Sequence, residues 1–238
     1  MKKWAKLTAF ALGVAALIFI LTYEFSENHS WKSWNLPLTG KIIIIDPGHG
    51  GMDGGTVGDG GVIEKDISLN IALKLRDYLQ EAGALVIMTR ETDRDLADDD
   101  TKRISARKTE DLRKRKEIIN GSNGDLFVSI HLNAIPSPRW RGAQVFYHPT
   151  GKEGEEVSKF IQDEIKRNLE NTDRLAKSID GIYLLRTAKI PGTLVEVGFL
   201  SNPTERELLK TEHYQMQVAA CIYQGILRYY TNEPVPKH

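Results

Sequence analysis

The chain has 238 residues, of which 41% are hydrophobic and 27% are charged, as is typical of a globular protein with a substantial core. Lys and Arg together number 32, as do Asp and Glu, and the resulting net charge of zero argues against a nucleic-acid-binding protein, which should be basic. The single cysteine excludes an internal disulfide and any metal site built from several cysteines.

The first 23 residues have the composition of an export segment. Lysines at positions 2, 3 and 6 precede the uncharged run LTAFALGVAALIFILTY at 7–23, and a basic start followed by an apolar run is typical of a secretory signal. The run is near the lower length limit of a membrane span, and no A-x-A cleavage motif follows it. We therefore expect residues 1–23 to be either a signal peptide or a membrane anchor, and we favour both over a buried core helix. Either form places the rest of the chain outside the cytoplasm, secreted or anchored to the outer face of the cytoplasmic membrane.

Residues 24–40 are polar, with scattered Trp31, Trp34 and Pro37, and they are predicted to form a tether. Strand and helix patterns then alternate regularly. We expect one folded domain at residues 41–231, followed by a short tail at 232–238.

The first elements of this domain follow from hydrophobic periodicity. The run KIIIID at 41–46 predicts a strand buried on both faces, and residues 64–82 carry apolar side chains at helical spacing up to Gly83. ALVIMT at 84–89 predicts a second strand. The charged, irregular stretch DRDLADDD at 93–100 is interpreted as a mobile loop.

The later elements continue the alternation. They are a charged helix at 105–120, strands at 125–131 and 142–148, a helix at 157–169, a weak strand at 181–186, a strong strand at 192–200 and a final helix around 218–229. Before the last helix, SNPTERE predicts a helix start with Asn202 as the cap, Pro203 at the first position and Glu205 closing a capping box. Cys221 belongs to the apolar pattern of the final helix and is predicted to be a buried thiol. The order of elements predicts a single α/β domain with a twisted, mostly parallel sheet flanked by helices on both faces.

Polar residues stand at the carboxyl ends of three predicted strands. His49 follows the first strand in DPGHGG, His131 ends the strand FVSIH, and Glu196 lies in LVEVGF. Carboxyl ends of parallel strands meet at one edge of a sheet, where sites form, so these side chains are expected to converge. Glu64, at the head of the first helix of the domain, adds a further carboxylate.

Two imidazoles and one carboxylate form the donor set of a catalytic zinc site whose fourth position is left to water. We therefore predict that His49, Glu64 and His131 bind Zn²⁺, which lowers the pKa of water to ~7 and polarises a carbonyl. Glu196 is the predicted catalytic base, which takes the proton of the water and passes it to a leaving amine. The glycines around His49 permit a sharp turn and a close backbone approach.

Each of these residues also has an ordinary structural interpretation. Taken alone, His49 is explained as a loop residue and His131 as a core histidine. Glu64 alone is explained as a favourable charge in a first helical turn. Glu196 is harder to explain in that way, because a carboxylate on a buried strand is costly unless something pairs with it. The spacing of the four residues does not identify the substrate. The sequence contains neither a phosphate-binding loop motif nor an H-E-x-x-H motif, so these two kinds of site are excluded.

Three further features are given structural interpretations. Arg174 and Lys177 are more readily explained as a solvated face than as a grip on an acidic substrate. The charged run 108–116 is interpreted as an exposed helix because it mixes both signs. His148, at a strand end, is a minor candidate for lining the cleft, and His213 is interpreted as a surface residue.

Around these residues the sequence resembles the zinc-dependent N-acetylmuramoyl-L-alanine amidases. The similar blocks are, in chain order, IDPGHGG, EKDISLNIALKL, MTRETD, FVSIHLNA, GAQVFY and PGTLVEVGFLSNPTE. They extend from about Lys41 to Tyr230, so the resemblance implies a zinc amidase catalytic domain at residues 41–231. It implies zinc ligands at His49, Glu64 and His131 and a catalytic glutamate at Glu196. The implied reaction hydrolyses the amide between the muramic acid lactyl group and L-alanine of peptidoglycan.

Within that family the architecture is most similar to the germination-specific spore-cortex amidases of endospore-forming bacteria. The basis of this similarity is a short N-terminal signal, a bare catalytic domain and no wall-binding repeats. It implies removal of stem peptides before muramic δ-lactam forms.

The sequence departs from the family at Leu132, where a smaller residue is usual, and it lacks the long insertion before LVEVGF that blocks some family members. An activating protein partner is compatible with such an open site. A zinc exopeptidase acting on stem peptides and a non-catalytic peptidoglycan-binding module stay as alternatives.

Overall fold

The computed structural model describes residues 2–28 and 36–237, and the chain divides into two compact units, Met1–Leu36 and Pro37–His238. Residues 29–35 of the predicted tether, with both of its tryptophans, lie outside the described residues, as does His238 of the predicted tail. The first unit contains helix α1 (Lys2–Asn28), which continues past the predicted end of the apolar segment.

Helix α1 carries the apolar run of the predicted export segment. Among the described residues, its window Lys3–Ile20 is long and apolar enough, by length and composition, to cross a membrane. The large apolar side chains described in this window are exposed, including Phe10, Leu17 and Phe19. This exposure agrees with a signal or anchor helix and not with the core helix of a globular domain.

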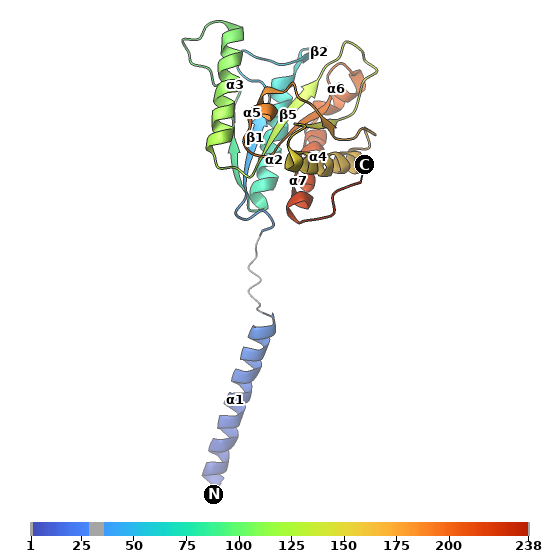
Figure 1. The fold of residues 1–238 in the computed structure, drawn as a ribbon. Coiled ribbons are helices and arrows are strands. Elements are labelled where there is room, and N and C mark those ends of the chain that lie inside the picture. The colour runs from blue at the N-terminus through green and yellow to red at the C-terminus, as the bar shows by residue number, and fades with distance from the viewer. Residues whose placement is uncertain (1, 29–35, 238) are drawn as a thin grey trace. The chain divides into compact units, whose positions relative to one another are not determined.

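The second unit is built on a six-stranded sheet with the order β4-β1-β5-β8-β6-β7 (Figure 1). Its elements are β1 (Ile42–Pro47), β2 (Val57–Gly58), β3 (Val62–Ile63), α2 (Glu64–Glu81), β4 (Leu85–Met88), α3 (Ile104–Gly121), β5 (Leu126–Asn133), β6 (Gln144–Tyr147), α4 (Lys152–Leu169), β7 (Lys177–Ser178), α5 (Tyr183–Thr187), β8 (Gly192–Phe199), α6 (Pro203–Leu209) and α7 (Glu212–Tyr230). Strand β1 pairs in parallel with β4 and β5, and β5 pairs in parallel with β8, whereas β6 runs antiparallel to β8. The predicted mostly parallel α/β domain is confirmed.

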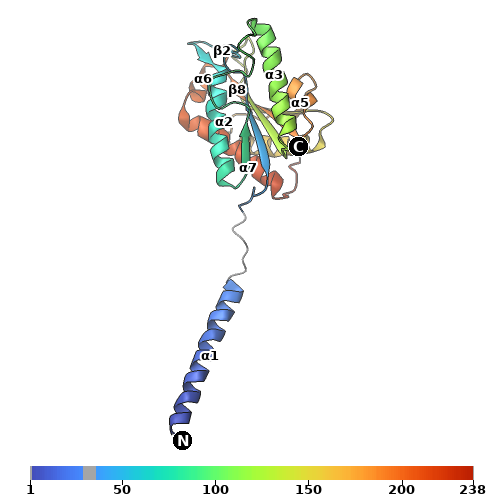
Figure 2. The same ribbon diagram turned by 90° about the vertical axis from the view of Figure 1, so that its left-hand side faces the viewer.

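Alternating side chains of the central strands enter two separate apolar layers. On β1, Ile43 and Ile45 belong to the main core with residues of α2, α4 and α7, while Ile44 packs on the opposite face with residues of α3 and α5. Figure 2 shows α2 and α3 on opposite sides of the strands. The predicted burial of this strand on both faces is confirmed, because all three side chains have no exposed surface.

On the α3 side, the same alternation becomes polar towards the carboxyl ends of the strands. Asp46 follows Ile44 at a spacing of two, and it is in register with Ser129 of β5. Two residues after Ser129, and on the same face of β5, His131 is in register with Glu196 of β8. The apolar half of this face is therefore core, and its polar half is the place where a site can form.

The weak strand predicted at 181–186 is wrong, because these residues lie in and around helix α5 (Tyr183–Thr187). A short apolar run has no periodicity that separates a strand from a single buried turn of helix. Leu184 and Leu185 are both buried under α3 in the smaller core. One edge of the sheet is formed by the polar pair Lys177–Ser178 of β7.

The acidic stretch predicted as a mobile loop at 93–100 is an irregular segment fastened to α3. Arg107 donates to both carboxylate oxygens of Asp95, at 2.6 and 3.1 Å, and to the carbonyl of Asp98 at 2.9 Å. Lys114 forms an ion pair with the Asp98 carboxylate. Its lack of regular structure is confirmed, but its charges serve as anchors to α3.

The start of α6 confirms one half of the predicted capping box. The Asn202 side chain accepts a hydrogen bond from the Glu205 backbone N–H at 3.0 Å, as a cap should. The Glu205 carboxylate does not close the box, because it accepts from the backbone N–H groups of Gly142 and Phe199. The buried thiol predicted at Cys221 is confirmed, with 3% of its surface exposed.

Candidate metal centre

Three of the predicted site residues meet at the carboxyl edge of the sheet. Glu64 Oε1 lies 3.2 Å from His49 Nε2 and 3.0 Å from His131 Nδ1. Each residue offers one such atom, and the three atoms all lie within 4.8 Å of one another. The structure thus brings together residues that stand far apart in the sequence.

Each of the three side chains comes from a different element. His49 stands in the turn after β1, with its backbone in the left-handed region at φ 62°, Glu64 is the first residue of α2, and His131 projects from β5. A short hairpin, β2 and β3, separates the first two and lies at the upper edge of the domain in Figure 1. A strand therefore supports His131, a helix supports Glu64, and a turn supports His49.

Two glycines leave the room that the imidazoles and the carboxylate occupy. A Cβ at Gly48 would lie 2.4 Å from the ring of His131, and a Cβ at Gly55 would lie 2.6 Å from both Glu64 Oε2 and the His49 ring. Real Cβ atoms essentially never approach so closely. Glycine at these positions is required by the close approach of the site residues.

Glu64 is buried and surrounded by hydrogen-bond donors. Its Oε2 accepts from the backbone N–H and the hydroxyl of Thr56, at 2.8 and 2.9 Å, while Oε1 accepts from the backbone N–H of Leu132 at 2.9 Å. Burial opposes ionisation, but hydrogen bonds and charge interactions with His131 and His49 outweigh it and hold the pKa of Glu64 well below its usual range. Glu64 is therefore an oriented, ionised carboxylate.

Asp53 supports His49 from the far side of the ring. Its Oδ2 lies 2.9 Å from His49 Nδ1 and 3.2 Å from Lys108 Nζ. Burial alone would lower the pKa of His49, but the carboxylates of Asp53 and Glu64 raise it from 6.5 to about 9. The two acids thus favour a positive charge at this point, and a carboxylate on the outer nitrogen of an imidazole is the usual support of a metal-binding histidine.

The donor set, and the spacing of Glu64 from each of the two histidines, fit a zinc ion. Zinc takes imidazole nitrogens and carboxylate oxygens at about 2.0–2.2 Å in a tetrahedron, which puts neighbouring ligand atoms roughly 3.3 Å apart. The distances of 3.2 and 3.0 Å from Glu64 Oε1 to the two nitrogens are close to that value. The identity of the ion stays a prediction, and these residues are suited to hold it.

Glu196 faces the same site from the neighbouring strand. Its Oε2 is buried and has no hydrogen-bond partner among the described residues. Burial raises the pKa of Glu196 to about 7, with the two histidines opposing the rise and Glu64 adding to it. A carboxyl group with an unpartnered oxygen and a pKa near neutrality is suited to accept and release a proton during a reaction.

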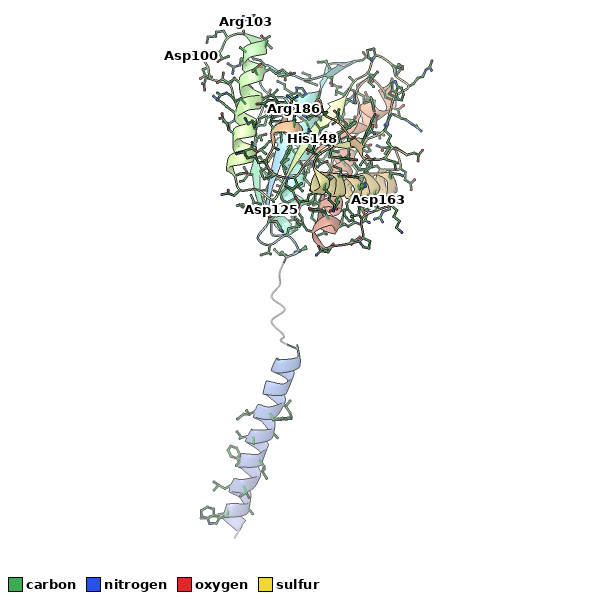
Figure 3. All side chains as sticks on the ribbon, in the orientation of Figure 1. Asp100, Arg103, Asp125, His148, Asp163 and Arg186 are labelled. Atoms are coloured by element: carbon green, nitrogen blue, oxygen red, sulfur yellow. The ribbon has the colours of Figure 1, made fainter. Side chains whose placement is uncertain are left out.

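The other candidates do not join this site. His148 contacts Thr150 and Asp180, and it lines a separate cavity with Arg186, as the labels in Figure 3 help to locate. Arg174 is partly exposed, and it also donates to the carbonyls of Arg141 and Gly142 and so holds a loop. Lys177 and His213 are exposed, as expected.

Sequence reasoning missed three residues that hold the site: Asp53, Arg90 and Arg115. Arg115 lies in the run 108–116, for which the sequence predicts an exposed helix, yet it is 1% exposed and forms ion pairs with the buried Asp46 and Asp111. A mixed charge run gives no sign that one member points inward. For Asp53 a signal existed, since it lies four residues after His49 in a glycine-rich turn.

Comparison with known proteins gives consistent matches. Residues 43–228 match the family described as N-acetylmuramoyl-L-alanine amidase. The chain is 58% identical, over 99% of both sequences, to the germination-specific N-acetylmuramoyl-L-alanine amidase of Bacillus subtilis. Among solved structures it is similar to the CwlD amidase of Clostridioides difficile in complex with the GerS lipoprotein, with a TM-score of 0.79 and 45% identity over 81% of this chain and 100% of that one. An N-acetylmuramoyl-L-alanine amidase of Clostridium difficile 630 has a TM-score of 0.72 and 31% identity over 82% of this chain and 98% of that one.

Proposed function

The chain belongs to the N-acetylmuramoyl-L-alanine amidase family, and on that premise we propose that it is a zinc-dependent amidase acting on the peptidoglycan of the spore cortex. The main support for zinc dependence is that the ligand atoms of His49, Glu64 and His131 all lie within 4.8 Å of one another. Glu196 Oε2, which has no hydrogen-bond partner in the described part of the chain, supports the catalytic assignment.

The proposed roles follow from the geometry. His49, Glu64 and His131 would hold the ion, since Glu64 Oε1 lies next to His49 Nε2 and His131 Nδ1. Zinc, when bound, lowers the pKa of a water molecule towards ~7 and polarises the amide carbonyl. Glu196 takes a proton from the attacking water and delivers it to the nitrogen of L-alanine, which leaves poorly unless it is protonated. The products are a free lactyl carboxylate on muramic acid and a free amino group on the stem peptide.

The test of this mechanism is Glu196→Gln. We expect the purified variant to keep about one zinc per chain and to lose amide cleavage by about 10²- to 10⁴-fold, because a base is not a ligand. Zinc content and release of stem peptides from purified peptidoglycan are measured together. Glu207→Gln, on the exposed side of α6, is the matched control and should behave like the parent.

Two outcomes would contradict the proposal. Parental cleavage by Glu196→Gln would assign the base to another residue. Full activity of protein stripped of metal by a chelator would remove zinc from the mechanism altogether.

A zinc exopeptidase with a similar sheet is the second candidate function. The distinction lies in the products, because an amidase frees the lactyl carboxyl of muramic acid, whereas an exopeptidase cuts peptide bonds within the stem. Mass spectrometry of digested peptidoglycan separates the two. The family match and the 58% identity over nearly the whole chain favour the amidase.

The biological setting is proposed from the relatives. In the spore cortex, removal of the stem peptide would leave the lactyl carboxyl free for muramic δ-lactam formation. The basic start and apolar run of α1 support export and retention at the outer face of the cytoplasmic membrane, or secretion if the segment is cleaved. A complex with a lipoprotein in one related structure supports an activating protein partner.

A further inference from the structure

The turn that carries His49 adopts a conformation that the residue would not choose by itself. A histidine at φ 62° lies in the left-handed region, which side chains other than glycine rarely occupy. Such a backbone persists where its surroundings hold it in place, and it is found often at functional sites. The question is which groups hold this turn.

Two buried arginines grip three successive carbonyl oxygens of the turn. Arg115 donates to the carbonyls of Pro47 and His49, at 2.7 and 2.5 Å. Arg90 donates to the carbonyls of Pro47 and Gly48, at 3.1 and 2.8 Å. Every backbone oxygen from position 47 to 49 therefore faces a guanidinium.

The two arginines are not equivalent. Arg115 is neutralised by the carboxylates of Asp46 and Asp111, each at 2.8 Å. Arg90 is 1% exposed, and no carboxylate of the described residues lies within ion-pairing distance of it. Its hydrogen-bond partners are backbone carbonyls and one hydroxyl. The carboxylates of Asp46, Asp93 and Asp111 favour the charge of Arg90 only from beyond ion-pairing distance, so a purely structural explanation would more readily place an apolar side chain here.

One nitrogen of Arg90 links the backbones of the two residues next to His49 and Glu64. Its Nη2 donates to the carbonyl of Gly48 at 2.8 Å and to that of Lys65 at 2.8 Å. Gly48 directly precedes His49, and Lys65 directly follows Glu64. The same guanidinium therefore bridges the turn after β1 and the first turn of α2. Gly50 leaves it room, since a Cβ there would lie 2.9 Å from Arg90 Cδ.

We propose that Arg90 is a positioning residue, which sets the distance between His49 and Glu64 by holding the backbone next to each of them. The inference rests on the proposed function only in that the site binds zinc. A planar guanidinium is needed for this role, because it presents several donors in fixed directions, whereas an ammonium is a single point of charge.

The experiment compares zinc binding by the full chain and by Arg90→Lys, which keeps the charge and loses the planar fork. We expect the zinc affinity, measured by competition with a chromophoric chelator, to fall by about 10- to 100-fold, the usual effect of losing a group that orients a metal ligand. The d–d spectrum of the cobalt-loaded variant should also change, since ligand geometry changes. Arg76→Lys is the matched control, because Arg76 forms ion pairs with Asp77 and Glu91 away from the site.

The outcomes separate this inference from the proposed function. A parent chain that binds no zinc contradicts the proposed function itself. A folded Arg90→Lys with parental zinc affinity and cobalt spectrum overturns the positioning role, even if its melting temperature is lower, since that is what a merely structural arginine would give.

A second variant covers the case in which Arg90→Lys does not fold. Ser68→Ala removes a hydroxyl that donates to the same Gly48 carbonyl at 3.0 Å and lies 3.3 Å from Arg90 Nη2. Its zinc affinity should fall by a smaller factor, in the range of about 2- to 10-fold. An unchanged affinity in this variant would overturn the inference.

Discussion

At the residue scale, the candidate site depends on glycines, which have no side chain, as much as on its histidines and carboxylates. Gly48 and Gly55 are in contact distance of His131, His49 and Glu64, and neither position has space for a methyl group. The polar members in turn are held by short contacts to one another and to the backbone. Small and large residues at this edge of the sheet therefore form one closely packed unit.

Gly48→Ala tests this packing. The added Cβ would stand 2.4 Å from the His131 imidazole, so the ring must leave its present position next to Glu64 Oε1. We expect zinc affinity to fall by at least about 10-fold, with a loss of stability of about 1–3 kcal/mol from overpacking. Chelator competition and urea denaturation measure the two effects.

Gly121→Ala is the control for this substitution. Gly121 ends α3, and a Cβ there would meet nothing within 4 Å. Because alanine favours helix over glycine, stability should be unchanged or slightly higher, and zinc affinity should be parental. Parental zinc affinity in Gly48→Ala would show that the ring of His131 can adapt.

At the element scale, the carboxyl end of β1 is joined to its neighbours by a buried polar network. Asp46 accepts from Ser129 of β5 at 2.6 Å, from Thr89 after β4 at 2.7 Å and from Arg115 of α3 at 2.8 Å. Burial alone would raise its pKa, but Arg115 and the two hydroxyls outweigh burial and lower the pKa of Asp46 from 3.8 to about 2. One carboxylate thus ties three strands to the helix that covers them.

This lowered pKa predicts a loss of stability in acid. A depressed carboxyl pKa stabilises the folded state fully above the unfolded value of 3.8, and the contribution is lost as pH falls through about 2. The difference in pKa corresponds to about 2 kcal/mol, of which roughly half is lost by about pH 3.

Asp46→Asn isolates this contribution from that of other acids. At neutral pH the variant should be less stable than the parent by about 3–5 kcal/mol, because Arg115 loses a buried partner. Between pH 5 and pH 3, however, its free energy of unfolding should fall about 1 kcal/mol less than that of the parent. Equal slopes for parent and variant in urea denaturation over this range would disprove the assignment to Asp46.

At the scale of the whole molecule, the catalytic unit carries its own core. Every buried hydrophobic residue among the described ones lies at or after Leu38, in the unit Pro37–His238. The unit therefore contains everything that hydrophobic burial needs for folding. Helix α1 is long and apolar enough to cross a membrane, by length and composition, and it is the export or anchoring segment proposed above.

Removal of residues 1–36 should accordingly leave the free energy of unfolding of the domain within about 0.5 kcal/mol of the full chain. Removal of residues 1–40 is the matched comparison. It deletes Leu38, which is fully buried and donates its backbone N–H to Ala82 O at 3.0 Å. This second truncation should cost about 2–3 kcal/mol in urea denaturation. An equal stability of the two truncated chains would contradict the assignment of Leu38 to the core.

Much of the fold was predictable because its signals are local. The buried run 41–46, the amphipathic helix at 64–82 and the polar residues at strand ends are visible within short windows, and parallel strands bring their carboxyl ends to one edge. The sequence by itself therefore determined the α/β class, the apolar N-terminal helix proposed as an export segment, and the four residues His49, Glu64, His131 and Glu196 as candidates for one site.

Only the tertiary structure decided which other charges are buried and what they hold. Arg90 and Arg115 look like ordinary charged residues in sequence, and Leu184 and Leu185 look like a strand, because local pattern carries no information about partners far along the chain. Burial of a guanidinium depends on carbonyls and carboxylates that arrive from other elements. The physical reason is that the free energy of a buried charge is set by its surroundings in space, whereas periodicity reports only the path of the backbone.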